Sequence, residues 1–152
     1  MKRTRLEFLG ILLSLSILIA CASNPDSPPP AEGVRAEKGQ VLVTDRLDVD
    51  FAAYQVTFLE IGADRCIPCK KMQPIMKEIA AEFAEDVQVV FYDVWKNPEP
   101  GRKYSIQLIP TQVFLDDRGK EFFRHEGFYP EAEIDTLFRK RGLTVMPAGP
   151  VP

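Results

Sequence analysis

Two cysteines separated by two residues, Cys66 and Cys69, are the residues of this chain best suited to chemistry, within the stretch GADRCIPCKKMQP over residues 62–74. Such a pair can be half of a zinc site, a haem attachment, a structural disulfide or a redox couple. A closed zinc site needs a full tetrahedral set of ligands, and the chain holds a single histidine, His125. Haem attachment needs a histidine directly after the second cysteine, where this chain has Lys70. Zinc and haem are therefore disfavoured, and we expect no metal site.

A redox couple is favoured over a structural disulfide, because a bond that closes so short a loop removes little conformational entropy from the unfolded chain. The pair stands where a helix is predicted to begin. There Cys66 faces unpaired backbone N–H groups and the positive end of the helix dipole, which stabilise a thiolate. Arg65 and Lys70 add positive charge, and Pro68 falls in the first turn, where its missing N–H costs least. We expect Cys66 to be the exposed attacking thiol and Cys69 the shielded resolving thiol.

The elements that position the pair follow from hydrophobic periodicity. Apolar runs predict strands over 41–44 and 55–62, and apolar residues at steps of three and four predict an amphipathic helix over 69–85. Downstream, the pattern predicts a strand over 87–94, a short helix within 97–105, a hairpin over 111–127 and a closing helix over 129–142. This order predicts an α/β fold with a central mixed sheet flanked by helices. The cysteine pair lies where the second strand leads into the long helix.

The N-terminus has the pattern of a secretory signal. Basic residues in MKRTR precede an apolar run over residues 8–20, which is shorter than the roughly 20 residues needed to span a bilayer. A basic start and a short apolar segment are typical of a signal peptide, predicted over residues 1–20. The alternatives for this segment are a buried core helix or an uncleaved membrane anchor.

The end of that segment, Leu18-Ile19-Ala20-Cys21, resembles the lipobox of bacterial lipoproteins. The resemblance implies cleavage before Cys21, lipid attachment to its sulfur, and an exported protein anchored to a bacterial membrane that faces the periplasm or the cell exterior. With Cys21 lipidated, Cys66 and Cys69 can pair only with each other. Residues 21–40 are rich in Pro, Ser, Ala and charge, a composition that predicts a disordered spacer behind the lipid.

Composition limits the remaining possibilities. A formal net charge of −3 gives no positive surface for nucleic acid, so we expect no nucleic-acid partner. The length allows one domain, predicted over residues 41–142, followed by a flexible tail over residues 143–152.

Two segments, CIPCKKMQPIMKEIAAEF and NPEPGRKYSIQLIPTQVFLDDRGKEFFRHEG, resemble the thioredoxin superfamily, and the likeness extends over about residues 41–142. The matching features are the Cys-x-x-Cys helix start, a proline eight residues after the first cysteine, an Asn-Pro pair, and Ile109-Pro110-Thr111. Members of this superfamily have a cis-proline at the position of Pro110, although Pro110 taken alone would be read as an ordinary trans proline.

The resemblance implies a thiol–disulfide oxidoreductase with no cofactor beyond its own disulfide. It assigns Ile109, Pro110 and Thr111 to the edge that binds the substrate chain. The residues around the cysteines, Arg65, Ile67 and Pro68, are assigned to the same substrate-binding surface. Arg65 and Ile67 depart from the best-known motif of the superfamily, so substrate identity and redox potential do not follow from it.

Glu60 stands six residues before Cys66 inside an apolar strand. A carboxyl buried there has a raised pKa and can move a proton. Thioredoxins carry a buried aspartate at this place, and a glutamate resembles the membrane-tethered thioredoxin-like reductases of cytochrome c maturation. The lysine that partners the acid in thioredoxins falls at Phe91. The alternative for Glu60 is a surface position facing water.

Together these features predict an exported, lipid-anchored reductase of protein disulfides, in cytochrome c maturation or related thiol homeostasis. Cys66 attacks, Cys69 resolves and Glu60 carries the proton, while a membrane protein supplies electrons. The alternatives are a disulfide oxidase or isomerase, and a non-enzymatic module that holds copper(I) between the two thiolates. Trp95 is expected at the edge of the core or beside the active site.

Overall fold

The longest fully buried strand, β2 (Val56–Gly62), lies at the centre of the sheet in the computed structural model, which describes residues 33–145. It pairs in parallel with β3 (Val87–Asp93) and antiparallel with β4 (Thr111–Asp116). The edges are β1 (Val41–Val43), parallel to β3, and β5 (Glu121–Glu126), antiparallel to β4. The resulting five-stranded sheet has the order β1-β3-β2-β4-β5, which confirms the predicted mixed sheet.

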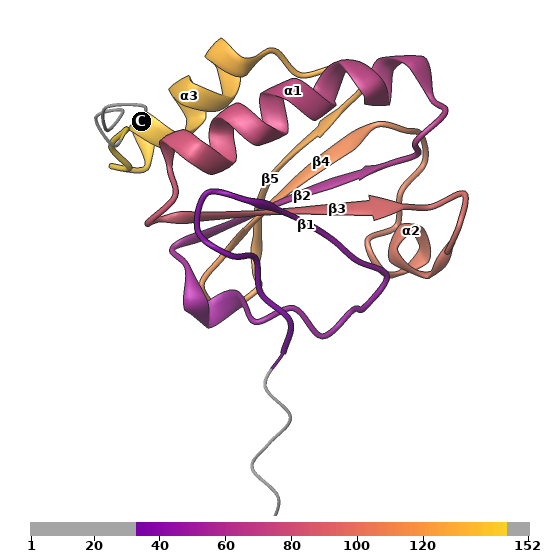
Figure 1. Ribbon diagram of the computed structural model, residues 1–152, viewed down its shortest axis with the longest axis horizontal. Helices are drawn as coiled ribbons and strands as arrows, with labels where there is room; N and C mark the ends of the chain where they lie inside the picture. Colours follow the sequence, from indigo (N-terminus) through magenta and orange to yellow (C-terminus); the bar gives the residue numbers. More distant parts are fainter. Residues whose placement is uncertain (1–32, 146–152) are drawn as a thin grey trace, which may run out of the picture. The chain divides into compact units, whose positions relative to one another are not determined.

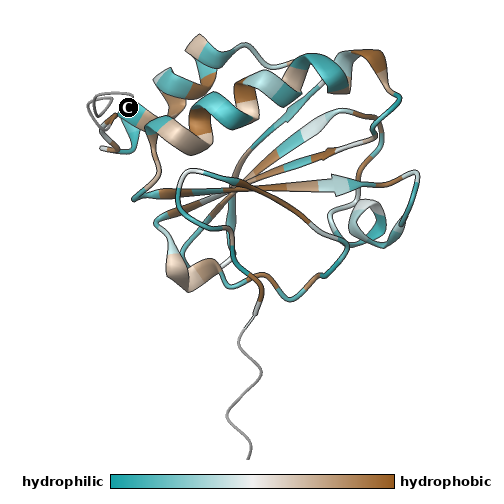
Figure 2. Ribbon diagram, in the orientation of Figure 1, coloured by the Kyte–Doolittle hydropathy of each residue, from teal (hydrophilic) through white to brown (hydrophobic). Residues whose placement is uncertain are grey.

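Helices α1 (Ile67–Glu82) and α3 (Glu131–Lys140) cover one face of this sheet (Figure 1). Their apolar side chains pack with those of β2, β3 and β4, and Phe58 stacks on Phe114 with ring centroids 4.8 Å apart. Figure 2 shows hydrophobic residues interspersed with hydrophilic ones along the strands, and the helices striped, as expected of helices with one buried side. Pro74 lies inside α1 without dividing it.

The opposite face of the sheet is covered by irregular chain, by the short helix α2 (Glu99–Lys103) and by a 3₁₀ turn, η1 (Phe51–Ala53). Val34 is held here by two backbone hydrogen bonds: its N–H donates to the carbonyl of Asp48 at 2.8 Å, and its carbonyl accepts from Asp50 at 2.8 Å. Ala36 is buried, and its carbonyl accepts a hydrogen bond from the Tyr54 hydroxyl at 2.9 Å.

The domain is therefore longer than predicted at both ends. The spacer predicted over residues 21–40 is wrong for residues 33–40, because Val34 and Ala36 find apolar and hydrogen-bonding partners on the sheet. The predicted tail is wrong for residues 143–145, since Leu143 is buried against α3 and its N–H donates to Phe138 at 3.1 Å. The predicted signal peptide (1–20), Cys21 and the rest of the predicted spacer and tail lie outside the described residues. Within residues 33–145, no helix is long and apolar enough to cross a membrane.

Candidate active site

The cysteine pair lies at the start of α1, just beyond the carboxyl end of β2. Cys66 is the N-cap residue of α1, and its sulfur is bonded to that of Cys69. The backbone N–H of Cys69 points at the Cys66 sulfur, with the two atoms 3.4 Å apart. An N–H aimed in this way, at the positive end of a helix, stabilises a thiolate on Cys66 once the disulfide is reduced.

The two sulfurs differ in access. Cys66 is 8% exposed and Cys69 1% exposed, so the first cysteine is less exposed than predicted but is the one that a partner can reach. Cys69 is shielded on its inner side by Gly62. A β-carbon on Gly62 would stand 3.1 Å from the Cys69 sulfur, which is tighter than ordinary van der Waals contact. The glycine at the end of β2 therefore lets the second cysteine sit directly on the strand.

Glu60 is completely buried on β2, which rules out the surface alternative. Side chains two apart on a strand share a face, so Glu60 lies on the same side of the sheet as Gly62 and the Cys69 sulfur above it. Glu60 and Gly62 are separated by about 7 Å along the strand. Burial raises the pKa of the Glu60 carboxyl to about 8, because the charged form loses its hydration. The neighbouring residue on β3 is Phe91, which supplies no compensating cation.

Gln112, directly opposite Glu60 on β4, is a site residue that the sequence analysis missed. Its Nε2 donates to Glu60 Oε2 at 3.0 Å. The second carboxyl oxygen of Glu60, Oε1, and the amide oxygen of Gln112, Oε1, are both buried without a partner. A charged carboxylate with an unpartnered buried oxygen is costly, so the structure favours the neutral acid, whose proton reduces that cost. The feature of the sequence that could have identified Gln112 is its polar side chain within a largely apolar strand.

The loop before β4 brings the predicted substrate edge to the disulfide. The Ile109–Pro110 peptide bond is cis, as the resemblance implied. Ile109 packs against the buried cluster formed by Ala63, Cys66 and Cys69, and the Pro110 carbonyl accepts a hydrogen bond from Gly127 at 2.7 Å. Ile109 therefore lies beside the disulfide, just outside the paired part of the sheet.

Thr111, which the resemblance assigned to the same substrate edge, has a completely buried side chain, and Pro110 before it is also buried. Its hydroxyl donates to the Leu108 carbonyl at 2.7 Å and so shapes the loop. The residues around the cysteines are different: Arg65, Ile67 and Pro68 are all exposed, and Ile67 is 73% exposed. Their exposure leaves them accessible, and their part in substrate binding stays a prediction.

The single histidine of the chain belongs to an aromatic stack. His125, in the same cross-strand row as Gln112, stacks on Tyr129 with ring centroids 4.3 Å apart. Over residues 33–145, no group of three or more His, Cys, Asp or Glu side chains is placed to hold a metal ion.

Comparison with known proteins agrees with this geometry. The thioredoxin family model matches residues 40–140. Thioredoxin of Staphylococcus aureus is 29% identical over 85 residues, which cover 56% of this chain and 81% of that protein.

Solved structures share the fold. A mutant thioredoxin from Halobacterium salinarum NRC-1 superposes with a TM-score of 0.61 at 22% identity, covering 74% of this chain and 98% of that one. The short form of thioredoxin f from spinach chloroplast gives a TM-score of 0.59 at 20% identity, covering 71% and 99%. The family match extends over most of the described domain, and a disulfide caps α1 beside a cis-proline, so this chain belongs to the thioredoxin family as a thiol–disulfide oxidoreductase.

Proposed function

We propose that this protein is an exported, lipid-anchored reductase of protein disulfides that attacks through Cys66 and is recharged by a membrane electron donor. The observation that carries the redox assignment is the placement of Cys66 at the N-cap of α1, beside the Ile109 edge and above a buried acid. The reductive direction and the anchor rest on the sequence: on Glu60 as the buried acid and on the lipobox-like Leu18-Ile19-Ala20-Cys21.

The proposed reaction begins with the dithiol form. The Cys66 thiolate attacks one sulfur of a substrate disulfide, a mixed disulfide forms, and the other substrate sulfur leaves as a thiolate. Cys69 then loses its proton and attacks Cys66, which releases the second substrate sulfur and forms the Cys66–Cys69 bond. Two electrons pass from the enzyme to the substrate.

Glu60 handles the proton of the second step. A carboxylate on Glu60 accepts the proton from Cys69 and returns it towards the departing substrate thiolate, through one water where the gap requires it. A pKa of about 8 at Glu60 lies close to the ordinary thiol value of about 8.5, so transfer in either direction is nearly balanced. The pKa of Glu60 reaches this value because its carboxyl is buried and its neighbour on β3, Phe91, carries no positive charge.

The direction of electron flow is tested by the midpoint potential of the Cys66–Cys69 couple, titrated against defined dithiol buffers, together with an insulin-reduction assay. We expect a potential near that of thioredoxin, about −270 mV, and catalysed insulin reduction. Cys66→Ser is the control and should leave insulin reduction at the background rate. A potential near about −120 mV, typical of a strong oxidase, contradicts the reductase proposal. Stoichiometric copper(I) binding without disulfide exchange favours the metal-carrier alternative.

The anchor is tested separately by expressing the full chain in bacteria with a labelled fatty acid. We expect label on the protein and recovery in the membrane fraction, both lost in Cys21→Ala, because that variant has no sulfur to acylate. Cys66→Ala is the matched control and should keep the label. Equal labelling of the two variants, or no label on the unaltered chain, contradicts lipid attachment at Cys21.

A further inference from the structure

The side-chain amide of Gln112 is completely buried and contacts Glu60, the acid that receives the Cys69 proton. We propose that Gln112 is a positioning residue for that step: its hydrogen bond holds one carboxyl oxygen of Glu60, leaves the other to exchange the proton, and favours the charged acid that acts as the base. This inference rests on the proposed function, and it adds the residue that controls the base.

The contact between the two side chains is built into the sheet. Glu60 and Gln112 are directly opposite in the antiparallel register of β2 and β4, and both are completely buried. Directly opposite residues have β-carbons about 4.5–5.5 Å apart on the same face. Gln112 Nε2 and Glu60 Oε2 are 3.0 Å apart, which is a normal hydrogen-bond distance. The strand pairing therefore holds the donor against the acid.

The two carboxyl oxygens of Glu60 have different surroundings. Oε2 accepts the hydrogen bond from Gln112, whereas Oε1 is buried and has no partner among residues 33–145. The carbonyl oxygen of a carboxylic acid accepts a hydrogen bond better than its hydroxyl oxygen, so the bond from Gln112 directs the proton to Oε1. Gln112 thus determines which oxygen exchanges the proton with Cys69.

Gln112 is also the group that favours the charged acid. Of the side chains around Glu60, Gln112 lies on β4, Phe91 on β3 and Cys69 on α1. Burial raises the pKa of Glu60 and the hydrogen bond from Gln112 lowers it, and no charge elsewhere in residues 33–145 contributes. A hydrogen bond to a carboxylate is stronger than one to the neutral acid. The amide therefore provides part of the stabilisation that a cation would give.

His125 is the titratable side chain on the other side of Gln112, since the two are opposite in the register of β4 and β5. Its Nε2 lies 3.2 Å from the Phe128 carbonyl, and its ring stacks on Tyr129. These contacts engage the ring with the chain that follows β5. A variant of His125 therefore serves to test whether a nearby histidine causes the pH dependence.

The resolving step can be timed without a natural substrate, by mixing the reduced protein with the aromatic disulfide dithiobis-nitrobenzoate. The Cys66 thiolate attacks one sulfur of the reagent and releases a first thionitrobenzoate. The Cys69 thiolate then attacks the Cys66 sulfur, releases a second thionitrobenzoate and forms the Cys66–Cys69 bond, while its proton passes to Glu60. Stopped-flow absorbance measures the second release as a function of pH. We expect its rate to rise with pH around the Glu60 pKa of about 8.

Gln112→Met keeps the length of the side chain and removes the donor. We expect the midpoint of the pH profile to rise by about one pH unit, and the rate at neutral pH to fall about tenfold, because the Glu60 carboxylate loses its hydrogen bond. Gln88→Met is the matched control: it removes a similarly buried amide, bonded to Thr57, on the other face of the sheet. This control and His125→Gln should keep the midpoint. An unchanged midpoint in Gln112→Met, or an equal shift in either control, overturns the inference.

Infrared spectroscopy of the oxidised protein gives a readout that does not depend on turnover. The carbonyl band of protonated Glu60 is identified by its absence from Glu60→Gln, and a hydrogen bond to the carbonyl oxygen lowers its frequency. We expect this band to move to higher frequency in Gln112→Met and to stay in place in Gln88→Met. A band at the frequency of a free carbonyl in the unaltered protein, or one that Gln112→Met does not move, overturns the positioning role. A second release equally fast in Glu60→Gln and the unaltered protein overturns instead the proton transfer in the proposed function, and the infrared band still decides the contact with Gln112.

Discussion

Replacing Cys66 with serine is expected to lower the rate of disulfide exchange by about a thousandfold or more, because a serine hydroxyl does not ionise at neutral pH and cannot form the mixed disulfide. Replacing Cys69 with serine leaves the first step intact and removes the second. The substrate should then remain bonded to Cys66. Mass spectrometry and non-reducing electrophoresis after one turnover measure both outcomes.

The prediction rests on the asymmetry of the two sulfurs. Cys66 is the more exposed of the pair and receives the Cys69 N–H, whereas Cys69 is covered by β2 at Gly62. The two single variants are each other's controls, since each removes one sulfur from the same bond. A stable adduct on Cys69 in the Cys66→Ser protein, with none on Cys66 in the Cys69→Ser protein, would reverse the assigned roles.

Glu60 is expected to lower the free energy of unfolding of the oxidised protein as pH rises from about 4.5 to about 8, contributing a fall of about 5 kcal/mol at about 1.4 kcal/mol per pH unit. The sign follows from Glu60, whose pKa is about 8 when folded and 4.5 when exposed in the unfolded chain. Below 4.5 the carboxyl is neutral in both states. Between the two values the unfolded chain releases the proton more readily, which favours unfolding. Urea denaturation at several pH values measures the slope.

Glu60→Gln should remove most of that slope. A glutamine at this position keeps the size of the side chain, stays neutral at every pH, and has an amide oxygen that can still accept from Gln112 Nε2. We therefore expect similar stability to the unaltered protein at pH 5 and greater stability at pH 9. Glu131→Gln is the comparison variant, because a hydrogen bond with Glu78 raises the pKa of Glu131 to about 7, within the same window. An unchanged slope in Glu60→Gln would contradict a neutral buried Glu60.

The order of the helices and strands could be predicted because each type of element has its own spacing of apolar residues along the sequence. The burial of Glu60 also followed, because its neighbours in β2 are apolar on both sides. The position of the disulfide followed from the alternation of strand and helix. The cis bond before Pro110 came from family resemblance, since the residue types at this point permit either isomer.

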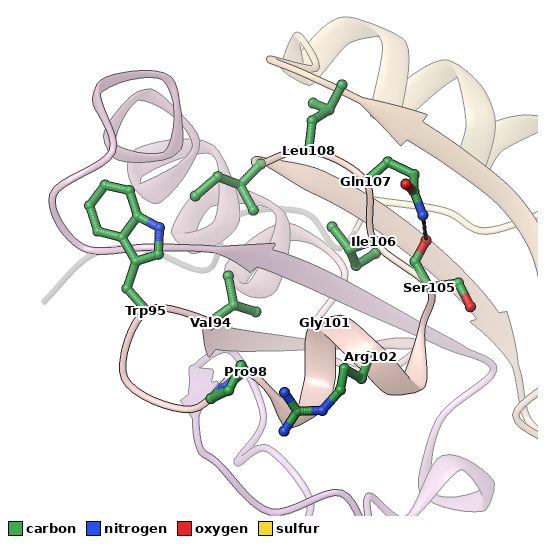
Figure 3. A pocket seen from close by; sticks show the side chains of 10 residues that line it. Val94, Trp95, Pro98, Gly101, Arg102, Ser105, Ile106, Gln107 and Leu108 are labelled. Carbon is green, nitrogen blue, oxygen red and sulfur yellow. Dashed lines mark hydrogen bonds between the residues drawn. The ribbon is translucent and has the colours of Figure 1, made fainter.

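Features that depend on pairing between distant segments could not be predicted in this way. Gln112 meets Glu60 only because β2 and β4 are antiparallel in one register, although the two residues are 52 positions apart in the sequence. A shift of one residue would turn Gln112 to the other face of the sheet. The resemblance assigned Thr111 to the substrate-binding edge because it follows Pro110, whereas the pleat of β4 turns its side chain towards the interior. A pocket lined by Trp95, Ile106 and Ile109 (Figure 3) likewise arises from two loops that meet only in the fold.

The way the N-terminal segment joins the sheet determines where a pulling force would act. Tension on the chain at Gly33 is first carried by the backbone bonds of Val34 and by the Tyr54 hydroxyl on Ala36, and then by β1 along the edge of the sheet. The strand that leads to the disulfide, β2, is separated from that edge by β3. If the chain is tethered through its N-terminus, as proposed, mechanical load on the tether would open the edge of the domain before it displaced the reacting sulfurs.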